Sequence, residues 1–418
     1  MIAALANRRF DFGEYITLST VASLFMQQKI AQVGVDLFLG YPVVILNALV
    51  LLTLNSLYAN PKHIFAIAAL TVFSLISAHY ASTPVSAIIA QILGISLMSV
   101  YYFSVLTSFG SSLSGWMELY ARFAYGVAVF GILYLPLQRF THYGEPDRLH
   151  SIFIEPSLYV YLTLPAIGWY ANIWLRTRRY GWDLLVFALT YVLADSSLGF
   201  LGLGLIGAFI ATSRLSFWKT LGAGILGLGA FAALMLVSSN FRVRVLDTFF
   251  AVSSADVSKS NLSTFAVLSN AYVTFQTFMD HPLLGVGIGG YRFQYEHYIG
   301  DLSGIPKNFL DLQVNMFDAS SMFLRTLAEL GIAGPLIVIG FLVTCARVRG
   351  ARYLEVRNAL LPFFLIRMGR YGAYFSMELF FFVAIYLLNF MEYRRSRQQL
   401  ASGRPSAAAL QSGPAWQG

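Results

Sequence analysis

Charged residues are scarce in this chain of 418 residues, where Asp, Glu, Lys and Arg together make up 11%, against roughly 25% in ordinary soluble domains. Apolar residues make up 57%, and the mean hydropathy is +0.65. This composition predicts a polytopic membrane protein. Cysteine occurs once, as Cys345, which excludes an intramolecular disulfide and a cysteine-based metal cluster.

Two further absences narrow the possible functions. The sequence has no internal repeat, so the inverted-repeat architecture of many secondary transporters has no support here. The stretches between the apolar runs contain no evident acidic cluster that could hold a metal ion. We therefore expect any positive charge needed at a site to come from arginine, and we expect no cofactor.

The apolar runs predict an all-α polytopic membrane protein. A spanning helix needs about 20 apolar residues, and by that measure the chain holds about 12 transmembrane helices. Their positions are near 14–28, 36–57, 64–81, 85–106, 116–136, 157–175, 182–195, 197–212, 218–238, 321–345, 358–373 and 374–392. Arg8 and Arg9 precede the first run, which no small-residue cleavage site follows, so we expect an uncleaved first span.

The basic residues set the expected orientation. The net charge is +8, and placing the N-terminus inside puts nearly every Lys and Arg cluster on the cytoplasmic side, as the positive-inside rule requires. This clustering between apolar runs argues against nucleic acid as a partner. The expected organisation is spans 1–9 in residues 1–238, one large external loop in 239–320, spans 10–12 in 321–392 and a disordered cytoplasmic tail in 393–418.

The external loop contains the most distinctive stretch of the chain, His281-Pro-Leu-Leu-Gly-Val-Gly-Ile-Gly-Gly-Tyr291. Four glycines in six positions (285–290) predict a tight turn with exposed backbone. Apolar residues at helical spacing over 265–279 precede it. A partner stretch, Ser320 to Gly331, carries Arg325 and Glu329 one helical turn apart.

These two stretches resemble the O-antigen ligase and polymerase superfamily of integral-membrane glycosyltransferases. The resemblance is carried by His281-Pro-Leu-Leu-Gly-Val-Gly-Ile-Gly289, by Leu327-Ala-Glu-Leu-Gly331 after a large external loop, and by Arg148-Leu-His-Ser-Ile-Phe-Ile-Glu-Pro-Ser157, which is similar to a segment of repeat-unit polymerases. It implies a metal-independent glycosyltransferase of the bacterial inner membrane. The donor would be a polyprenyl-diphosphate-linked glycan, with membrane lipids as further partners and a chain-length regulator as an optional one.

The chemistry can also be argued from the residues. Transfer from a diphosphate leaving group needs cations that stabilise the developing negative charge, and the fork of an arginine suits phosphate oxygens. Our candidates for binding the diphosphate are Arg292, Arg325, Arg367 and Arg370. Arg325 with Glu329 can equally be a structural i,i+4 pair.

The general base that deprotonates the acceptor hydroxyl is left open between Glu155 and His297. Ligases of the superfamily carry His-Asn where this chain has Ser320-Ser321, and many members have Ser-Arg-Gly at Ser197-Leu198-Gly199. The missing histidine favours a polysaccharide repeat-unit polymerase over an O-antigen-type ligase. A transporter of lipid-linked sugars is the alternative from a different functional class.

Overall fold

The computed structural model describes residues 11–402 apart from 33–35, 58–59, 110–111, 139, 141–146, 215, 238, 240–241, 244, 248, 250–261 and 302–312. The first part of the chain forms α2 (Phe12–Ser23), β1 (Lys29–Gln32), β2 (Asp36–Phe38), α3 (Gly40–Thr53), α4 (Pro61–Ala81), α5 (Val85–Ser108) and α6 (Leu113–Gln138). The middle forms α7 (Pro156–Thr177), α8 (Gly181–Ala194), α9 (Ser197–Arg214) and α10 (Phe217–Val237). The last part forms α12 (Leu262–Asp280), α13 (Tyr291–Tyr298), the short 3-10 helix η1 (Ile299–Asp301), α15 (Met322–Leu330), α16 (Ala333–Ala346), α17 (Ala351–Gly369) and α18 (Met377–Ala401).

The expected all-α class is confirmed, because helices make up most of the described residues and the sheet among them is a single antiparallel pair, β1 with β2. Within the described part of the chain, three helices, α4, α5 and α6, are long and apolar enough to cross a membrane, which supports a membrane protein. Shorter apolar helices include α3, α8, α9 and α16. Helix length and composition therefore do not confirm the count of twelve spans.

The structure differs from the expected boundaries in three places. The strand β2 lies within the second expected span, 36–57, and pairs with β1, which follows the first expected span, 14–28. The expected span 321–345 is two helices, α15 and α16, which part at Gly331 with φ +60°. Residues 393–401 of the expected disordered tail continue α18, because Arg352 pairs with Glu392 at 3.3 Å and Tyr353 hydrogen-bonds Ser396 at 2.8 Å; residues 403–418 lie outside the described residues.

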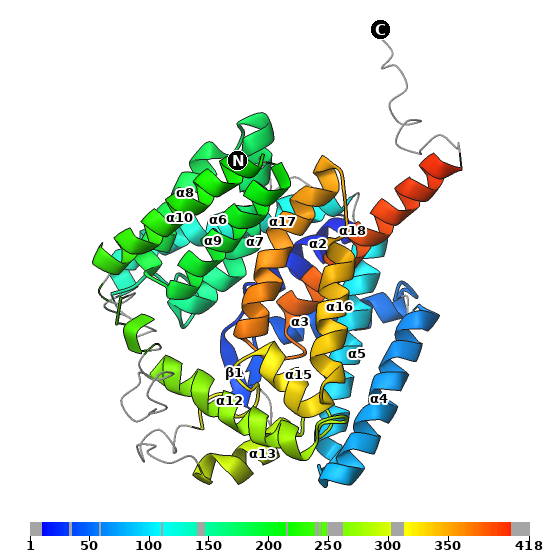
Figure 1. Ribbon diagram of the computed structural model, residues 1–418. Coiled ribbons are helices and arrows are strands. Elements are labelled where there is room, and N and C mark those ends of the chain that lie inside the picture. Colours follow the sequence, from blue (N-terminus) through cyan, green and yellow to red (C-terminus); the bar gives the residue numbers. More distant parts are fainter. Residues whose placement is uncertain are drawn as a thin grey trace.

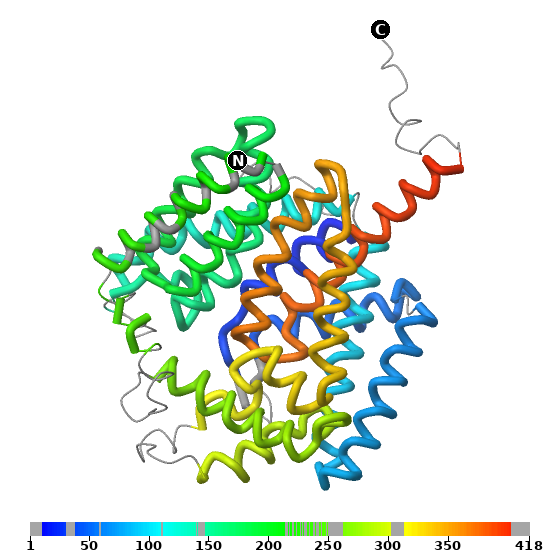
Figure 2. Tube along the Cα trace, in the orientation of Figure 1, coloured from blue at the N-terminus to red at the C-terminus, as the bar shows by residue number. Residues whose placement is uncertain are grey.

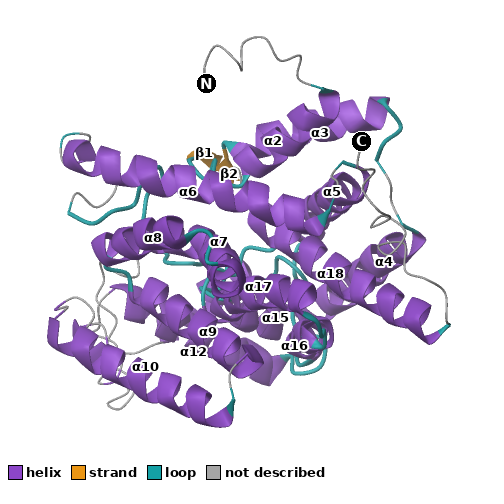
Figure 3. Ribbon diagram, turned by 90° about the horizontal axis from the view of Figure 1, so that it is seen from above, coloured by secondary structure: helices purple, strands orange, loops and turns teal. Residues whose placement is uncertain are grey.

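The helices form a bundle with a layer across one end. In Figure 1, α16, α17 and α18 stand together in the centre, with α8, α9 and α10 on one side and α4 on the other. The trace in Figure 2 shows α12 and α13 running across the end of this bundle. Seen from above in Figure 3, α7 and α17 lie in the middle, and α7 packs against α6, α8, α9 and α17. The segment expected as an external loop therefore covers the bundle with helices.

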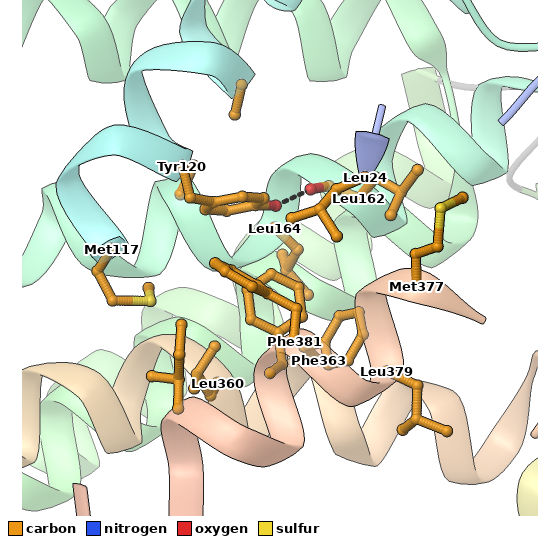
Figure 4. Packing of buried hydrophobic residues seen from close by; sticks show 14 of the residues in the cluster. Leu24, Met117, Tyr120, Leu162, Leu164, Leu360, Phe363, Met377, Leu379 and Phe381 are labelled. Carbon is orange, nitrogen blue, oxygen red and sulfur yellow. Dashed lines mark hydrogen bonds between the residues drawn. The ribbon is translucent and has the colours of Figure 1, made fainter. Parts of the chain in front are cut away.

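The core lies where α6, α7, α17 and α18 meet. Tyr120 of α6 donates its hydroxyl hydrogen to the carbonyl oxygen of Leu162 in α7, and its ring lies 6.1 Å from that of Phe381 in α18 (Figure 4). A buried polar link joins α17 to its neighbours, because the Asn358 amide donates to Asn172 Oδ1 at 3.1 Å and to Ser213 Oγ at 2.9 Å. Since a buried amide needs partners, this link fixes the register of α7, α9 and α17.

Candidate functional site

The bundle and the helices that cover it form the walls of a partly open cavity of about 710 Å³, which we call the polar cavity. It lies where α7, α9 and α12 begin and where α17 ends. Its lining residues are Arg148, Glu155, Pro156, Ser157, Ser196, Ser197, Leu198, Ser239, Val243, Leu262, Ser263, Thr264, Ala266, Val267, Leu268, Val314, Asn315 and Arg370. The lining thus combines two guanidinium groups, one carboxylate and several hydroxyls.

Three helices point their N-terminal ends at the polar cavity. The first residues of α7 (Pro156), α9 (Ser197) and α12 (Leu262) all line it. The first N–H groups of a helix have no partner within the helix and carry a partial positive charge. Such ends bind phosphate and other anions.

Arg370 and Arg148 add full positive charges. Arg370 is the C-cap residue of α17, is half-buried, and makes no side-chain hydrogen bond or ion pair with any residue that the structure describes. Arg148 donates to the carbonyl oxygens of Ala194 and Asp195 at 3.1 and 2.7 Å, so it closes the end of α8 as well as lining the cavity. Arg370 is therefore the cation that is better placed to bind a ligand.

Glu155 is the acidic residue of the lining. It precedes Pro156, the first residue of α7, is exposed, and accepts a hydrogen bond from Ser157 Oγ at 2.8 Å. Its extended backbone (φ −128°, ψ 141°) is the conformation that a residue before proline favours. The carboxylate is consequently held at the cavity wall with access to a bound molecule.

Ser196 is a further polar group at this wall. Its side chain is 1% exposed, and its hydroxyl has no hydrogen-bond partner among the described residues. Buried hydroxyls are nearly always hydrogen-bonded. An unpartnered hydroxyl beside three helix N-termini is therefore a second, independent sign of a ligand in the polar cavity.

Two of the predicted diphosphate ligands, Arg325 and Arg367, lie elsewhere. Arg325 is 3% exposed and pairs with Glu329 at 3.2 Å. This is the structural i,i+4 ion pair that the sequence left open as the alternative to diphosphate binding. Arg367 is 1% exposed and pairs with Glu378 at 2.9 Å. Both guanidinium groups are thus neutralised by carboxylates of the protein, and neither lines the polar cavity.

Arg292 and His297 lie together on α13, away from the polar cavity. The guanidinium of Arg292 lies 4.4 Å from the ring centre of Phe293, and its Nε is buried without a partner among the described residues. His297 is exposed, and its ring lies 4.6 Å from that of Tyr298. Of the six predicted site residues, the structure therefore brings together Glu155 and Arg370.

The glycine turn packs against α4, against Thr83 between α4 and α5, and against α15. Gly287 has φ +81°, and a Cβ there would lie 2.7 Å from the carbonyl oxygen of Ser74 in α4. Its N–H donates to the carbonyl oxygen of Glu329 at 2.9 Å, and Thr83 Oγ1 donates to that of Val286 at 2.7 Å. The turn therefore joins α15 to the corner between α4 and α5, which is a structural use of glycine.

Part of the lining of the polar cavity comes from a stretch that the sequence already marks. The stretch Arg148 to Ser157 supplies four of the lining residues, of which Glu155 is a predicted base. The start of α12 had no signal beyond its apolar spacing, because its role depends on where the helix docks. Among the described residues, no three His, Cys, Asp or Glu side chains gather at a possible metal site.

The chain was also compared with known proteins. No model of a protein family matches it, and a search of curated proteins found no significant match.

Proposed function

We propose that the chain is a multi-pass membrane glycosyltransferase that polymerises polyprenyl-diphosphate-linked repeat units at the external face of the bacterial inner membrane, with both termini in the cytoplasm. The observation that carries the proposal is the joint presence of Arg370, Glu155 and three helix N-termini at one cavity. A diphosphate needs the positive groups, and an acceptor hydroxyl needs a base. The polar cavity offers both.

The expected topology supports this use of the cavity. Every lining residue lies in or at the edge of a stretch that the distribution of Lys and Arg assigns to the external side: the stretch up to 157, the boundary at 195–198, the loop 239–320 and the end of span 358–373. Lipid-linked sugars that are polymerised outside the cell membrane would be reached from that side.

In the proposed reaction, the acceptor hydroxyl oxygen attacks the anomeric carbon of the donor glycan. The bond between that carbon and the diphosphate oxygen breaks, and the electron pair leaves with the polyprenyl diphosphate. Glu155 takes the hydroxyl proton. Arg370 and the N-termini of α7, α9 and α12 stabilise the charge that develops on the leaving group.

Variants of the cavity test the proposal in a strain that lacks the native gene. Glu155→Gln removes the base and should lower the polymerisation rate by about 10²–10⁴-fold, and Arg370→Ala should lower it by about 10²–10³-fold. His297→Gln, the competing base, should leave the rate within about 3-fold. The measurement is the chain-length ladder of glycan at matched protein levels.

The deletion strain distinguishes the remaining alternatives. We expect short lipid-linked units and no long glycan. Long glycan that stays on the lipid carrier would instead identify a ligase, and a normal ladder on the final acceptor would refute any role in assembly. Movement of a lipid-linked sugar across liposomes by the purified protein, without lengthening, would identify a transporter.

A further inference from the structure

The segment that carries Arg370 is held in place by two buried arginines. Residues 370–376 connect α17 to α18. Arg325 donates from Nη1 to the carbonyl oxygen of Gly372 at 3.1 Å, and Arg367 donates from Nη2 to the carbonyl oxygen of Ala373 and to Ser376 Oγ, the latter at 2.8 Å. Two guanidinium groups therefore fix the carbonyls of consecutive residues.

Each arginine pairs with a carboxylate, and each carboxylate also accepts a hydrogen bond from another part of the chain. Glu329 pairs with Arg325 and accepts the N–H of Tyr291, which follows the glycine turn, at 3.3 Å. Glu378 pairs with Arg367 and accepts from Gln27 Nε2 at 3.1 Å. The two ion pairs thus tie the segment 370–376 to α13, α15 and the region between α2 and β1.

The segment itself has a conformation that needs support. Tyr371 has φ +66°, in the left-handed region that costs a non-glycine residue free energy unless its surroundings impose it. Its ring lies 4.3 Å from that of Tyr161 in α7. At Gly372 a Cβ would overlap the carbonyl oxygen of Asp318, so only glycine fits there.

We infer that Arg325 and Arg367 are positioning residues, which hold the segment 370–376 so that the guanidinium of Arg370 faces the polar cavity. The identity of the ligand that Arg370 binds rests on the proposed function, whereas the holding of the segment does not. The two buried arginines then act on a ligand through Arg370 and never touch the diphosphate. Their exposures of 3% and 1%, together with their carboxylate partners, agree with this role.

Hydrogen exchange of the purified full chain in detergent, without ligand, tests the holding directly. In Arg325→Lys and Arg367→Lys, a single ammonium cannot reach the acceptors that the planar fork reaches. We expect the amides of residues 371–376 to exchange on the order of 10-fold faster, the effect of losing one or two hydrogen bonds. Arg370→Lys is the matched control and should leave this exchange unchanged.

A second variant distinguishes the loss of these hydrogen bonds from misfolding caused by an unpaired buried charge. The double variant Arg367→Met with Glu378→Leu removes both buried charges at similar volume, which folded proteins tolerate. Exchange over 371–376 should still rise, because the donors to Ala373 and Ser376 are gone. Unchanged exchange in this variant and in both lysine variants would overturn the inference.

Binding of farnesyl diphosphate, measured by calorimetry, separates positioning from direct contact. If Arg367 acts through Arg370, then Arg367→Lys should weaken binding in the wild-type background by about 10-fold and have little effect in the Arg370→Ala background. Equal losses in both backgrounds would show a direct contact and overturn the positioning role. If the wild type binds no farnesyl diphosphate while exchange rises as expected, the positioning role stands and the proposed diphosphate substrate is refuted.

Discussion

Removing Glu378 should destabilise the protein strongly, because Arg367 would remain buried and unpaired. The guanidinium is 1% exposed, and it donates to Glu378 at 2.9 Å and to the Tyr161 hydroxyl at 2.6 Å. Breaking a buried ion pair by removing one partner costs about 3–5 kcal/mol. We therefore expect Glu378→Ala to lower the free energy of unfolding by this amount.

Removing both charges should cost less than the two single removals added together. In Arg367→Met with Glu378→Leu no unpaired charge remains, and the loss is limited to the hydrogen bonds of Tyr161, Ala373, Ser376 and Gln27, at about 1 kcal/mol each. The coupling free energy of the double-mutant cycle should therefore exceed about 2 kcal/mol. The exposed pair Arg352 and Glu392, at 3.3 Å with 52% and 37% of the side chains exposed, is the matched control. Its coupling should stay below about 1 kcal/mol.

The assay is unfolding of the purified chain in mixed detergent micelles with increasing SDS, followed by circular dichroism. All four variants of each cycle are measured under the same conditions. If the effects of Arg367→Met and Glu378→Leu simply add, the two side chains do not form the buried pair on which the positioning role of Arg367 depends.

Two further predictions concern the glycine turn and a buried carboxyl. Gly287→Ala should lower the thermal midpoint of unfolding, because φ +81° and the Ser74 carbonyl oxygen at 2.7 Å make an alanine cost about 1–3 kcal/mol. The control Gly126→Ala lies in a helix with open space around it and should raise the midpoint slightly. Equal midpoints for the two variants would contradict the packing described for the glycine turn. Desolvation raises the pKa of the half-buried Asp318 carboxyl against the opposing effects of the Ser320 N–H, Arg325 and Arg370. A raised pKa means that the fold favours the protonated carboxyl. The stability that this group contributes is therefore present below the ordinary aspartate pKa of about 3.9 and is lost as the pH rises above it, so the thermal midpoint of the wild type should fall relative to that of Asp318→Asn. A difference between the two proteins that stays constant with pH would refute the assignment.

The sequence predicts the helices well and their interruptions poorly. Long apolar runs such as 85–106 match α5 because bilayer-length hydrophobicity and helix formation coincide. The break between α15 and α16 is harder to predict from the sequence, since Leu330, Gly331 and Ile332 continue the apolar run without interruption. It arises because Gly331 adopts φ +60° and the Ile332 N–H donates to the carbonyl oxygen of Pro282 at 3.0 Å, a contact that no local pattern encodes.

The same limit applies to the site. Sequence identified Glu155 and Arg370 separately, but nothing local to either residue indicates that they line one cavity. A cation in an apolar run indicates an anion nearby, and for Arg367 that anion is the protein's own Glu378. A guanidinium can be paired either by a carboxylate elsewhere in the protein or by a bound diphosphate, so the sequence alone does not show which of the two anions is present.

The partner of each arginine is what separates their roles. Arg325 and Arg367 have carboxylates at 3.2 and 2.9 Å, so they add little net charge to their surroundings. The lining of the polar cavity holds two arginines against one glutamate, a net charge of +1, and three helix N-termini add to it. A doubly charged phosphate group needs such an excess, and the excess disappears if Arg370 turns away. The burial of two complete ion pairs is therefore understandable as the means of fixing one half-buried charge at the cavity wall.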